Sequence, residues 1–281
     1  MLIKGITAAA ALASLLLCAV TGGFSGLSWL WVLPVSFAGI HVLLVIGAFL
    51  FLCLICKVVD LSVPQEHDSR FYRKAADLYA EAALTLLHTK LPTQGLEKIP
   101  ESGRFLVVCN HLSFMDPVIL LRYFRGHQLA FISKKENDNM FLIGKIMHKL
   151  MCQPIDREND REALKTILRC IRLLKEDEAS VAVFPEGYIS KDRKLHRFRS
   201  GVFKIATKAQ VPIVVCTVRD THTILPNARN LKRAEAWFHV VGVIPAEELK
   251  GRTTVDIADQ VYDMMIGDLG PEFVPRQADN T

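Results

Sequence analysis

The start of the chain is almost free of charge. Residues 5–56 contain no Lys, Arg, Asp or Glu, and His41 is their only histidine. Two apolar runs, residues 5–20 and 35–56, are separated by a segment rich in Gly, Ser and Thr. Because about 20 helical residues cross a bilayer core of about 30 Å, both runs are candidate membrane helices. The sequence therefore predicts a helical hairpin inserted in a membrane, over residues 1–60.

The residues that flank the hairpin indicate its topology. Lys4 and Lys57 lie at its two ends, and positive flanks favour the cytoplasmic side, so we expect the rest of the chain on that side. Pro34 is expected to help break the helix between the two runs, and Trp29 and Trp31 suit a membrane interface. A cleaved signal peptide followed by one anchor, or a hairpin only partly inserted into one leaflet, are the alternatives.

Composition bounds the class of protein. Hydrophobic residues make up 51% of the chain and mean hydropathy is +0.25, yet the residues after 57 have the mixed charge of a water-exposed domain. The net charge of +5 suits an anionic membrane surface or a phosphorylated substrate, and a solvated surface without a partner is the alternative. A nucleic-acid partner is not expected, because no basic helix, zinc-finger spacing or aromatic–basic interleaving is present. The seven cysteines follow no framework and predict free, buried thiols in a reducing compartment.

Residues 67–90 form the entry to the second part of the chain, residues 61–281. Charged residues there alternate with Phe71, Ala75, Leu78, Ala82 and similar residues at helical spacing. This pattern predicts an amphipathic helix that leads from the membrane to the domain or lies on its surface. A helix packed on the core is the alternative.

Strand and helix patterns alternate along the rest of the chain. Expected strands cover residues 104–109, 129–133, 180–184, 211–218 and 237–244, and expected helices begin at Asp116 or cover residues 139–151, 160–175, 200–209 and 254–266. Such alternation predicts an α/β domain with a largely parallel sheet flanked by helices. Ligands of such sheets bind beyond the carboxyl ends of the strands.

The first candidate chemical motif follows the strand that ends at Cys109. It contains Asn110, His111 and Asp116, and Asp116 also begins a helix before Pro117. An Asp that accepts a hydrogen bond from an imidazole fixes its tautomer and leaves the second nitrogen as a general base. A substrate hydroxyl would then take the place of a catalytic serine. By themselves, these residues also fit a structural His beside a helix-capping Asp.

A second motif, Phe184-Pro-Glu-Gly187, follows the strand that ends near residue 184. Gly187 permits a close backbone approach, and Glu186 is suited to accept hydrogen bonds from a polyol. Alone, this is an ordinary turn. Both motifs, however, come at the ends of strands, where a ligand of a parallel sheet would bind.

Taken in this order, the two motifs resemble those of the glycerolipid acyltransferase family, which includes the bacterial 1-acylglycerol-3-phosphate acyltransferase. Two further blocks are similar to the family pattern: Gln153-Pro-Ile-Asp-Arg157, and Val211-Pro-Ile-Val214. The resemblance covers residues 96–218. It implies a membrane O-acyltransferase of phospholipid biosynthesis, which makes phosphatidic acid from lysophosphatidic acid.

The resemblance also implies roles for individual residues. His111 is the general base for the sn-2 hydroxyl of lysophosphatidic acid, and Asp116 orients it. Asn110, Glu186 and Gly187 belong to the acceptor site, and Arg157 holds the phosphate. The acyl donor is acyl-CoA or acyl-carrier protein, used as a co-substrate, with no cofactor and no metal. The partners are thus the lipid bilayer, the lysophospholipid and the donor.

The second motif departs from the family pattern. Tyr188 and Ile189 stand where the family often has Thr and Arg, although Lys191 and Arg193 lie just beyond. An acyltransferase that acts on another lysophospholipid is therefore the main alternative. A membrane lipid hydrolase that activates water with His111 is less favoured, because a Gly-x-Ser-x-Gly elbow is absent from the sequence. A lipid-binding protein with an inactive site is a further alternative.

Overall fold

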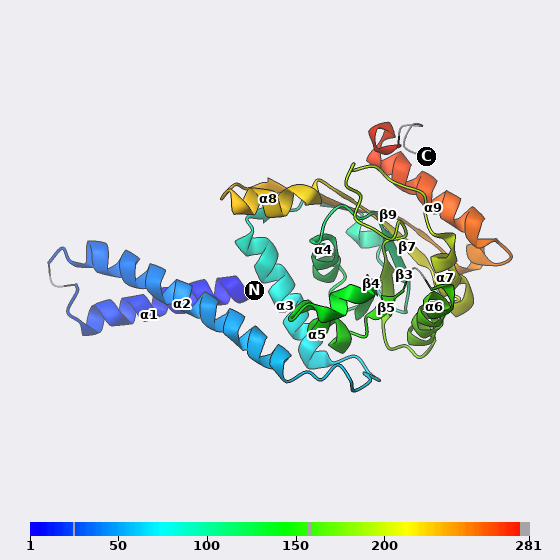
Figure 1. Cartoon of the computed structure of the whole chain (residues 1–281). Helices are drawn as coiled ribbons and strands as arrows, with labels where there is room; N and C mark the ends of the chain where they lie inside the picture. Colours follow the sequence, from blue (N-terminus) through cyan, green and yellow to red (C-terminus); the bar gives the residue numbers. More distant parts are fainter. Residues whose placement is uncertain (25, 157–158, 276–281) are drawn as a thin grey trace.

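The computed structural model describes residues 1–24, 26–156 and 159–275 (Figure 1). A hairpin of two helices, α1 (Leu2–Val20) and α2 (Trp29–Lys57), projects from an α/β body. The body is built on a seven-stranded sheet of order β2-β9-β7-β3-β6-β4-β5. Of the neighbouring strands that the structure describes, only β7 and β9 are antiparallel. The predicted fold class, a largely parallel sheet flanked by helices after an apolar hairpin, is confirmed.

The predicted long strands are present, and several short ones were missed. The sheet consists of β2 (Thr93–Gln94), β3 (Leu106–Cys109), β4 (Leu129–Lys134), β5 (Gln153–Ile155), β6 (Ser180–Val183), β7 (Ile213–Arg219) and β9 (Trp237–Ile244). A separate parallel pair joins β1 (Thr89–Lys90) to β8 (Ala234–Glu235). The strands that were missed have two or three residues, which is too short for an apolar pattern to stand out.

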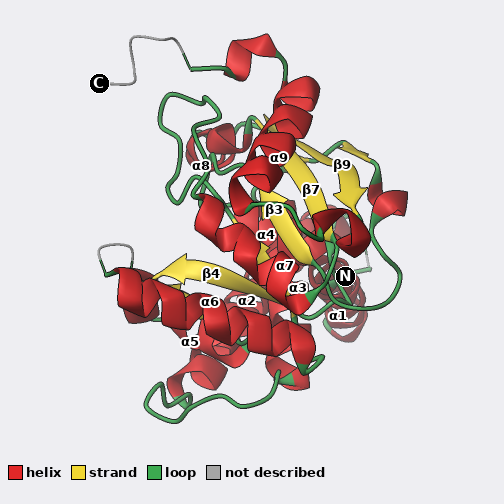
Figure 2. Ribbon diagram, turned by 90° about the vertical axis from the view of Figure 1, so that its right-hand side faces the viewer, coloured by secondary structure: helices red, strands yellow, loops and turns green. Residues whose placement is uncertain are grey.

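Helices cover both faces of the sheet (Figure 2). One face carries α3 (Arg70–Leu86), α4 (Asp116–Tyr123) and α5 (Ile143–Lys149), and the other carries α6 (Asp160–Lys175), α7 (Lys204–Ala209) and α9 (Thr254–Leu269). Residues of β3 alternate between them: Val107 and Cys109 pack on the first layer, Leu106 and Val108 on the second. This two-sided burial explains why β3 is a continuous apolar run. The remaining helix is α8 (Ile224–Arg229).

Short 3₁₀ turns complete the described elements. They are η1 (Leu96–Lys98), η2 (Lys135–Asn139), η3 (Ser200–Phe203), η4 (Thr221–Thr223), η5 (Ala246–Leu249) and η6 (Pro271–Phe273). The helices expected over residues 139–151 and 200–209 each begin with, or follow, such a turn. The helix expected over residues 160–175 matches α6 at both ends.

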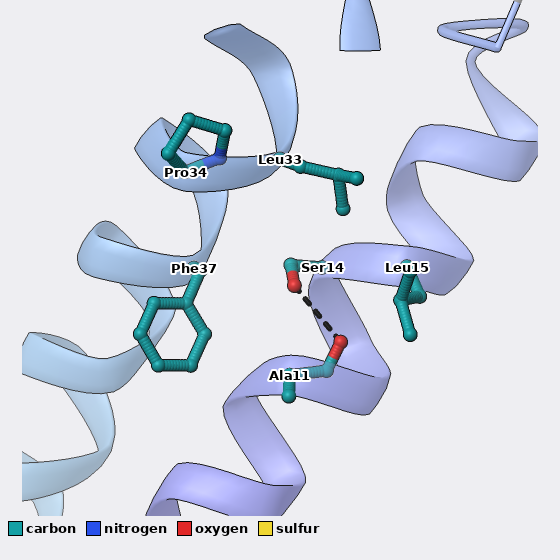
Figure 3. Close-up of a pocket in the computed structure, with 6 residues that line it drawn as sticks. All are labelled: Ala11, Ser14, Leu15, Leu33, Pro34 and Phe37. Atoms are coloured by element: carbon teal, nitrogen blue, oxygen red, sulfur yellow. Dashed lines mark hydrogen bonds between the residues drawn. The ribbon is translucent and has the colours of Figure 1, made fainter. Parts of the chain in front are cut away.

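The hairpin helices pack through small side chains. Ile6, Ala10, Ser14 and Cys18 are buried, and their four-residue spacing places them on one face of α1. Small residues let two helix backbones approach closely, which is how helices associate in a membrane. A shallow apolar groove remains between the helices (Figure 3), lined by Ala11, Ser14, Leu15, Leu33, Pro34 and Phe37. Both helices are long and apolar enough to cross a membrane.

The prediction that Pro34 helps to break the helix was wrong. Helix α2 begins at Trp29 and continues through Pro34. The backbone N–H groups of Trp31 and Val32 already donate to the Ser28 carbonyl, at 3.2 and 3.0 Å, before the proline is reached. A proline in the second turn removes one backbone hydrogen bond from a helix that has already started, and this loss is tolerated.

Helix α3 joins the hairpin to the body. The hydroxyl of Tyr72 donates to the Ile55 carbonyl at 2.8 Å, and that of Tyr79 donates to the Ala48 carbonyl at 2.6 Å. Ala76 and Leu84 of the same helix lie in the core. The helix expected over residues 67–90 thus leads from the hairpin to the domain and also packs on the core. The predicted division of the chain at residue 60 stays a prediction.

Candidate active site

Three neighbouring strands end at one edge of the sheet. Strand β3 lies between β6 and β7 and is parallel to both. His111 follows β3, Glu186 follows β6 and His222 follows β7. Because carboxyl ends of parallel strands meet at the same edge, residues far apart in sequence are brought together there.

His111 and Asp116 form a hydrogen-bonded pair. The His111 Nδ1 lies 2.8 Å from Asp116 Oδ2, which also accepts the backbone N–H groups of Leu112 at 2.7 Å and Ser113 at 2.8 Å. Asp116 is completely buried, and 16% of the His111 side chain is exposed. With Nδ1 as the donor, His111 Nε2 is the basic nitrogen, and it makes no hydrogen bond within the described residues.

The local backbone makes this pairing possible. Asp116 is the first residue of α4, and its N–H donates to the Ser113 carbonyl at 3.1 Å. A carboxylate is favourable at a helix start because the helix dipole is positive there. The Ser113 hydroxyl accepts the Met115 N–H at 3.2 Å and makes no hydrogen bond to His111. Ser113 is therefore not arranged as a nucleophile.

The second motif supports His111 from the side. The Phe184 ring stacks on the imidazole, with centroids 4.0 Å apart and planes inclined by 16°. Glu186 Oε1 accepts the His111 N–H at 3.0 Å, and the His111 carbonyl accepts the Ser190 N–H at 2.8 Å. Ring and backbone of His111 are thus held by the loop after β6.

Glu186 is turned toward the protein. Its Oε2 accepts the His196 N–H at 3.0 Å, and only 2% of the residue is exposed. Burial raises the pKa of Glu186 to about 7, although the backbone hydrogen bonds from His196 and His111 oppose the shift. Gly187 follows with φ of 83°, a left-handed conformation that favours glycine. Both oxygens of the carboxylate are used by the backbone, and the predicted contact of Glu186 and Gly187 with substrate stays a prediction.

The loop from residue 188 to residue 199 is held by hydrogen bonds to Asp192. Asp192 Oδ1 accepts the Ser190 hydroxyl at 2.8 Å, the Lys194 N–H at 3.1 Å and a His196 ring nitrogen at 2.8 Å. Burial opposes ionisation of Asp192, but the hydrogen bonds from His196 and Ser190 outweigh it and lower its pKa to about 2. This carboxylate folds the basic loop back over the end of β6.

Asn110 lies beneath the site. Its side-chain Nδ2 donates to the Val218 carbonyl at 3.0 Å, and its Oδ1 accepts the Val218 N–H at 2.8 Å. Asn110 is 2% exposed. Its predicted contact with substrate stays a prediction, and the contact seen is with β7. Arg157, the predicted phosphate ligand, lies outside the described residues; β5, which precedes it, is separated from β3 by β4 and β6.

Sequence reasoning missed the turn after β7. Thr221 Oγ1 and His222 Nδ1, like Asp116 Oδ1, are buried without a hydrogen-bond partner. Burial lowers the pKa of His222, Arg193 lowers it further, and Asp220 and Asp116 raise it. His222 therefore lies within electrostatic reach of both Asp116 and Arg193. The order of the strands, which places β7 beside β3, is the signal for this position, and it is not visible in the sequence.

All seven cysteines are free, and all but Cys53 are buried, as predicted. Within residues 1–24, 26–156 and 159–275, no group of three or more His, Cys, Asp or Glu is arranged to hold a metal ion.

Comparisons with known proteins agree with this geometry. Residues 90–219 match the profile of the family described as Acyltransferase. The chain is 37% identical over 158 residues to 1-acyl-sn-glycerol-3-phosphate acyltransferase BAT2, chloroplastic, of Brassica napus, covering 56% of this chain and 45% of the relative. It is 30% identical over 178 residues to a probable 1-acyl-sn-glycerol-3-phosphate acyltransferase of Mycoplasma pneumoniae, covering 62% of this chain and 66% of the relative. The chain thus spans less than half of the first of these relatives.

A solved structure has the same fold. The crystal structure of the 1-acyl-sn-glycerophosphate (LPA) acyltransferase PlsC from Thermotoga maritima superposes with a TM-score of 0.59 at 23% identity. The superposition covers 70% of this chain and 79% of that one. This likeness concerns the fold.

Proposed function

We propose that this chain, which belongs to the acyltransferase family, transfers a fatty acyl group to the sn-2 hydroxyl of lysophosphatidic acid and so makes phosphatidic acid. The donor is a thioester, acyl-CoA or acyl-carrier protein, and no cofactor or metal takes part. The observation that carries the proposal is the His111–Asp116 pair, at 2.8 Å, with Nε2 unoccupied at the edge of the sheet.

The reaction follows from this arrangement. His111 Nε2 takes the proton of the acceptor hydroxyl while the hydroxyl oxygen forms a bond to the thioester carbonyl carbon. The carbonyl electron pair moves to its oxygen; when it returns, the C–S bond breaks, and the thiolate leaves with the proton from His111. Asp116 stabilises the imidazolium in between. General-base assistance of this kind is worth about 10²–10⁴-fold in rate.

No protein nucleophile is needed. The Ser113 hydroxyl, which is the nearest serine in sequence, is engaged by the Met115 N–H. The nucleophile is then the acceptor itself, and the product is an ester of that acceptor. Glu186 contributes by positioning, since its carboxylate accepts the His111 backbone N–H at 3.0 Å.

The phosphate of the acceptor requires a cation near His111. Arg193 is the first candidate, because it lies three residues after Ser190, whose N–H donates to the His111 carbonyl at 2.8 Å. Guanidinium groups match phosphate through paired hydrogen bonds. Arg157 is the second candidate. The apolar Ile189 favours the alternative acceptor, a lysophospholipid with another headgroup.

The membrane arrangement is part of the proposal. The apolar helices α1 and α2 cross the bilayer, and Lys4 and Lys57 keep both ends on the cytoplasmic side together with the body. Trypsin added to sealed vesicles of known orientation tests this, because the body is cleaved only from the cytoplasmic face.

The deciding experiment is acyl transfer by the purified chain in liposomes. Lysophosphatidic acid and lysophosphatidylcholine are offered side by side, with acyl-CoA and then acyl-carrier protein as donors. We expect activity on lysophosphatidic acid, lost in His111→Asn and retained in His88→Asn. His88 is the matched control because it is exposed, and Asn tolerates its φ of 48°.

Each outcome has a definite meaning. Activity mainly on lysophosphatidylcholine keeps the chemistry and replaces the acceptor. Release of free fatty acid without ester formation identifies a hydrolase. Equal activity of His111→Asn and the unaltered chain removes the proposed base.

A further inference from the structure

We infer that α8 and the loop after it, residues 224–233, form a second membrane contact that rests on anionic lipid headgroups. These residues are called the α8 segment below. The inference depends on the proposed insertion of the hairpin, but not on the acyl-transfer reaction. It concerns how the body is held against the membrane rather than how the chain is anchored in it.

The α8 segment lies at the end of the body that faces the hairpin (Figure 1). Strand β8, which follows it, pairs with β1, and β1 follows the end of α3 directly. The amino group of Met1 contacts Glu81 near the same end of α3. The start of α1 and the α8 segment therefore lie near one end of a single helix.

This placement sets the α8 segment close to the height of the membrane surface. Helix α1 has 19 residues and is about 28 Å long at about 1.5 Å per residue, close to the bilayer core of about 30 Å. A spanning α1 therefore has its first residue at the interface. The α8 segment, which lies beside that end of α3, is then within reach of the headgroups.

The segment displays a leucine in an unusual way. Leu231 is 92% exposed and has a φ of 54°, a left-handed conformation that Leu rarely adopts. Hydrogen bonds fix the turn: the Leu231 N–H donates to the Ala228 carbonyl at 3.0 Å, and the Lys232 N–H donates to the Asn227 carbonyl at 2.8 Å. These bonds end the helix and hold Leu231 in the left-handed conformation, so that its side chain points away from the body. In water this exposure is unfavourable, and insertion of the Leu231 side chain between lipid headgroups accounts for it.

The rest of the segment has the same character. Leu225 is 43% exposed, whereas its neighbour Ile224 is fully buried and anchors α8 to the core. The apolar side chains of Leu225 and Leu231 thus extend from a turn that is already ordered. A preordered turn loses little conformational freedom when it binds.

The basic side chains of the α8 segment indicate that its partner is anionic. Arg229, Lys232 and Arg233 are exposed, and no carboxylate of the described residues forms a salt bridge with them. Residues 221–233 contain no Asp or Glu. Each basic residue near an anionic membrane favours the bound state by about fivefold. Two exposed leucines among three unpaired cations match a surface of anionic headgroups over an apolar layer.

The contact has a consequence for the site. The α8 segment begins two residues after His222, at the edge of the sheet that carries His111. Docking of this segment places that edge on the bilayer surface. A lysophospholipid would then reach His111 without leaving the membrane.

Limited proteolysis of the full chain tests the contact without any need for activity. The chain is reconstituted into vesicles of phosphatidylcholine alone or with phosphatidylglycerol, and trypsin cleavage after Arg229, Lys232 and Arg233 is followed by mass spectrometry. We expect cleavage to slow by about tenfold or more in the anionic vesicles. Cleavage after Lys250, exposed in the loop before α9 on the far side of the body, is the internal control and stays unchanged.

Two variants separate membrane contact from a structural role. Leu231→Gly removes the side chain and suits the left-handed backbone, so it keeps the fold while protection falls by about tenfold. If the α8 segment docks on anionic lipid, phosphatidylglycerol should stimulate acyl transfer by the unaltered chain. Replacement of Arg229, Lys232 and Arg233 by Gln is expected to abolish this stimulation and to leave activity in detergent unchanged. The matched control replaces Lys204, Lys208 and Lys250, which are exposed on the other side of the body, by Gln.

The overturning result is equally specific. If trypsin cleaves the α8 segment at equal rates in both kinds of vesicle, relative to the Lys250 bond, the surface does not contact lipid. Protection that persists unchanged in Leu231→Gly would likewise contradict the inserted leucine. A chain without acyltransferase activity that still shows protection would contradict the proposed function alone.

Discussion

Asn110 and Val218 are 108 residues apart in the chain and are joined by two buried hydrogen bonds. The Asn110 amide takes the place of a strand neighbour at the point where β3 ends, and its two bonds attach this point to β7. His111 is the next residue. The position of the proposed base therefore depends on a contact between two adjacent strands.

Loss of this contact is expected to affect both stability and rate. Asn110→Ala leaves a buried N–H and a buried carbonyl of Val218 without partners, at about 1–3 kcal/mol each. We expect the free energy of unfolding to fall by about 2–6 kcal/mol, and kcat to fall as His111 loses its fixed position. Chemical denaturation and acyl-transfer kinetics measure the two effects. Asn139→Ala, at an exposed position, is the control; an equally small effect of both substitutions would contradict the prediction.

The charge of Asp116 can be separated from its hydrogen bonds. In Asp116→Asn, the amide oxygen can still accept the three N–H groups that Oδ2 accepts, and the amide nitrogen takes the unpartnered position of Oδ1. We expect kcat to fall by about 10²-fold or more, because the imidazolium loses its counter-charge, with little change in melting temperature.

Asp116→Ala provides the comparison. It removes the acceptor of all three N–H groups and is expected to lower the melting temperature as well as the rate. The prediction is that only this second variant is unstable. If Asp116→Asn retains full kcat, Asp116 acts only as a structural acceptor.

The raised pKa of Glu186 predicts a pH dependence of stability. The pKa of this carboxyl is about 7 in the folded chain and 4.5 for an ordinary Glu, so folding favours its neutral form. Stability from this group is complete below about pH 4.5 and is lost as pH rises through 7; the full loss is about 3 kcal/mol.

Glu186→Gln tests this pH dependence. The variant cannot ionise at this position, so its stability relative to the unaltered chain should rise between pH 5 and pH 8. Denaturant unfolding at both pH values measures the difference. A difference that is constant over this pH range would show that Glu186 is ionised throughout.

Small residues on α1 are expected to control the packing of the hairpin. Ala10 is fully buried between the helices, so Ala10→Leu forces them apart and should cost about 1–3 kcal/mol. Ala8→Leu adds the same apolar side chain at an exposed position and should be neutral. Thermal unfolding of both variants in the same detergent compares them. Equal melting temperatures would mean that α1 and α2 do not pack through Ala10.

Several elements were predictable because their signals are local. Helix α6 was predicted to its end residues, since its apolar stripe lies within one short segment. Strand β3 was predicted from a run of apolar residues, which two-sided burial requires. The hairpin was predicted from residues 5–56, because the absence of charge over a continuous stretch is also a local signal. The effect of Pro34, in contrast, depends on where the helix begins, and the sequence does not mark its start at Trp29.

The parts of the site were predictable, but their relationships were not. His111 and Asp116 are five residues apart, so their pairing was visible in the sequence. The contacts of Glu186 with His111 and of Asn110 with Val218 link residues separated by 75 and 108 positions. Such contacts depend on which strands become neighbours, and no local pattern of residues specifies strand order.

The sequence by itself therefore determined which segments avoid water, where α6 and the long strands lie, and which side chains can do chemistry. Tertiary structure alone decided that β3 lies between β6 and β7, that Glu186 faces the backbone, and that β9 runs antiparallel to β7. The physical reason is the distance along the chain over which each interaction acts. Hydrophobic periodicity and helix capping act over a few residues, whereas strand order and buried hydrogen bonds are selected by packing of the whole chain.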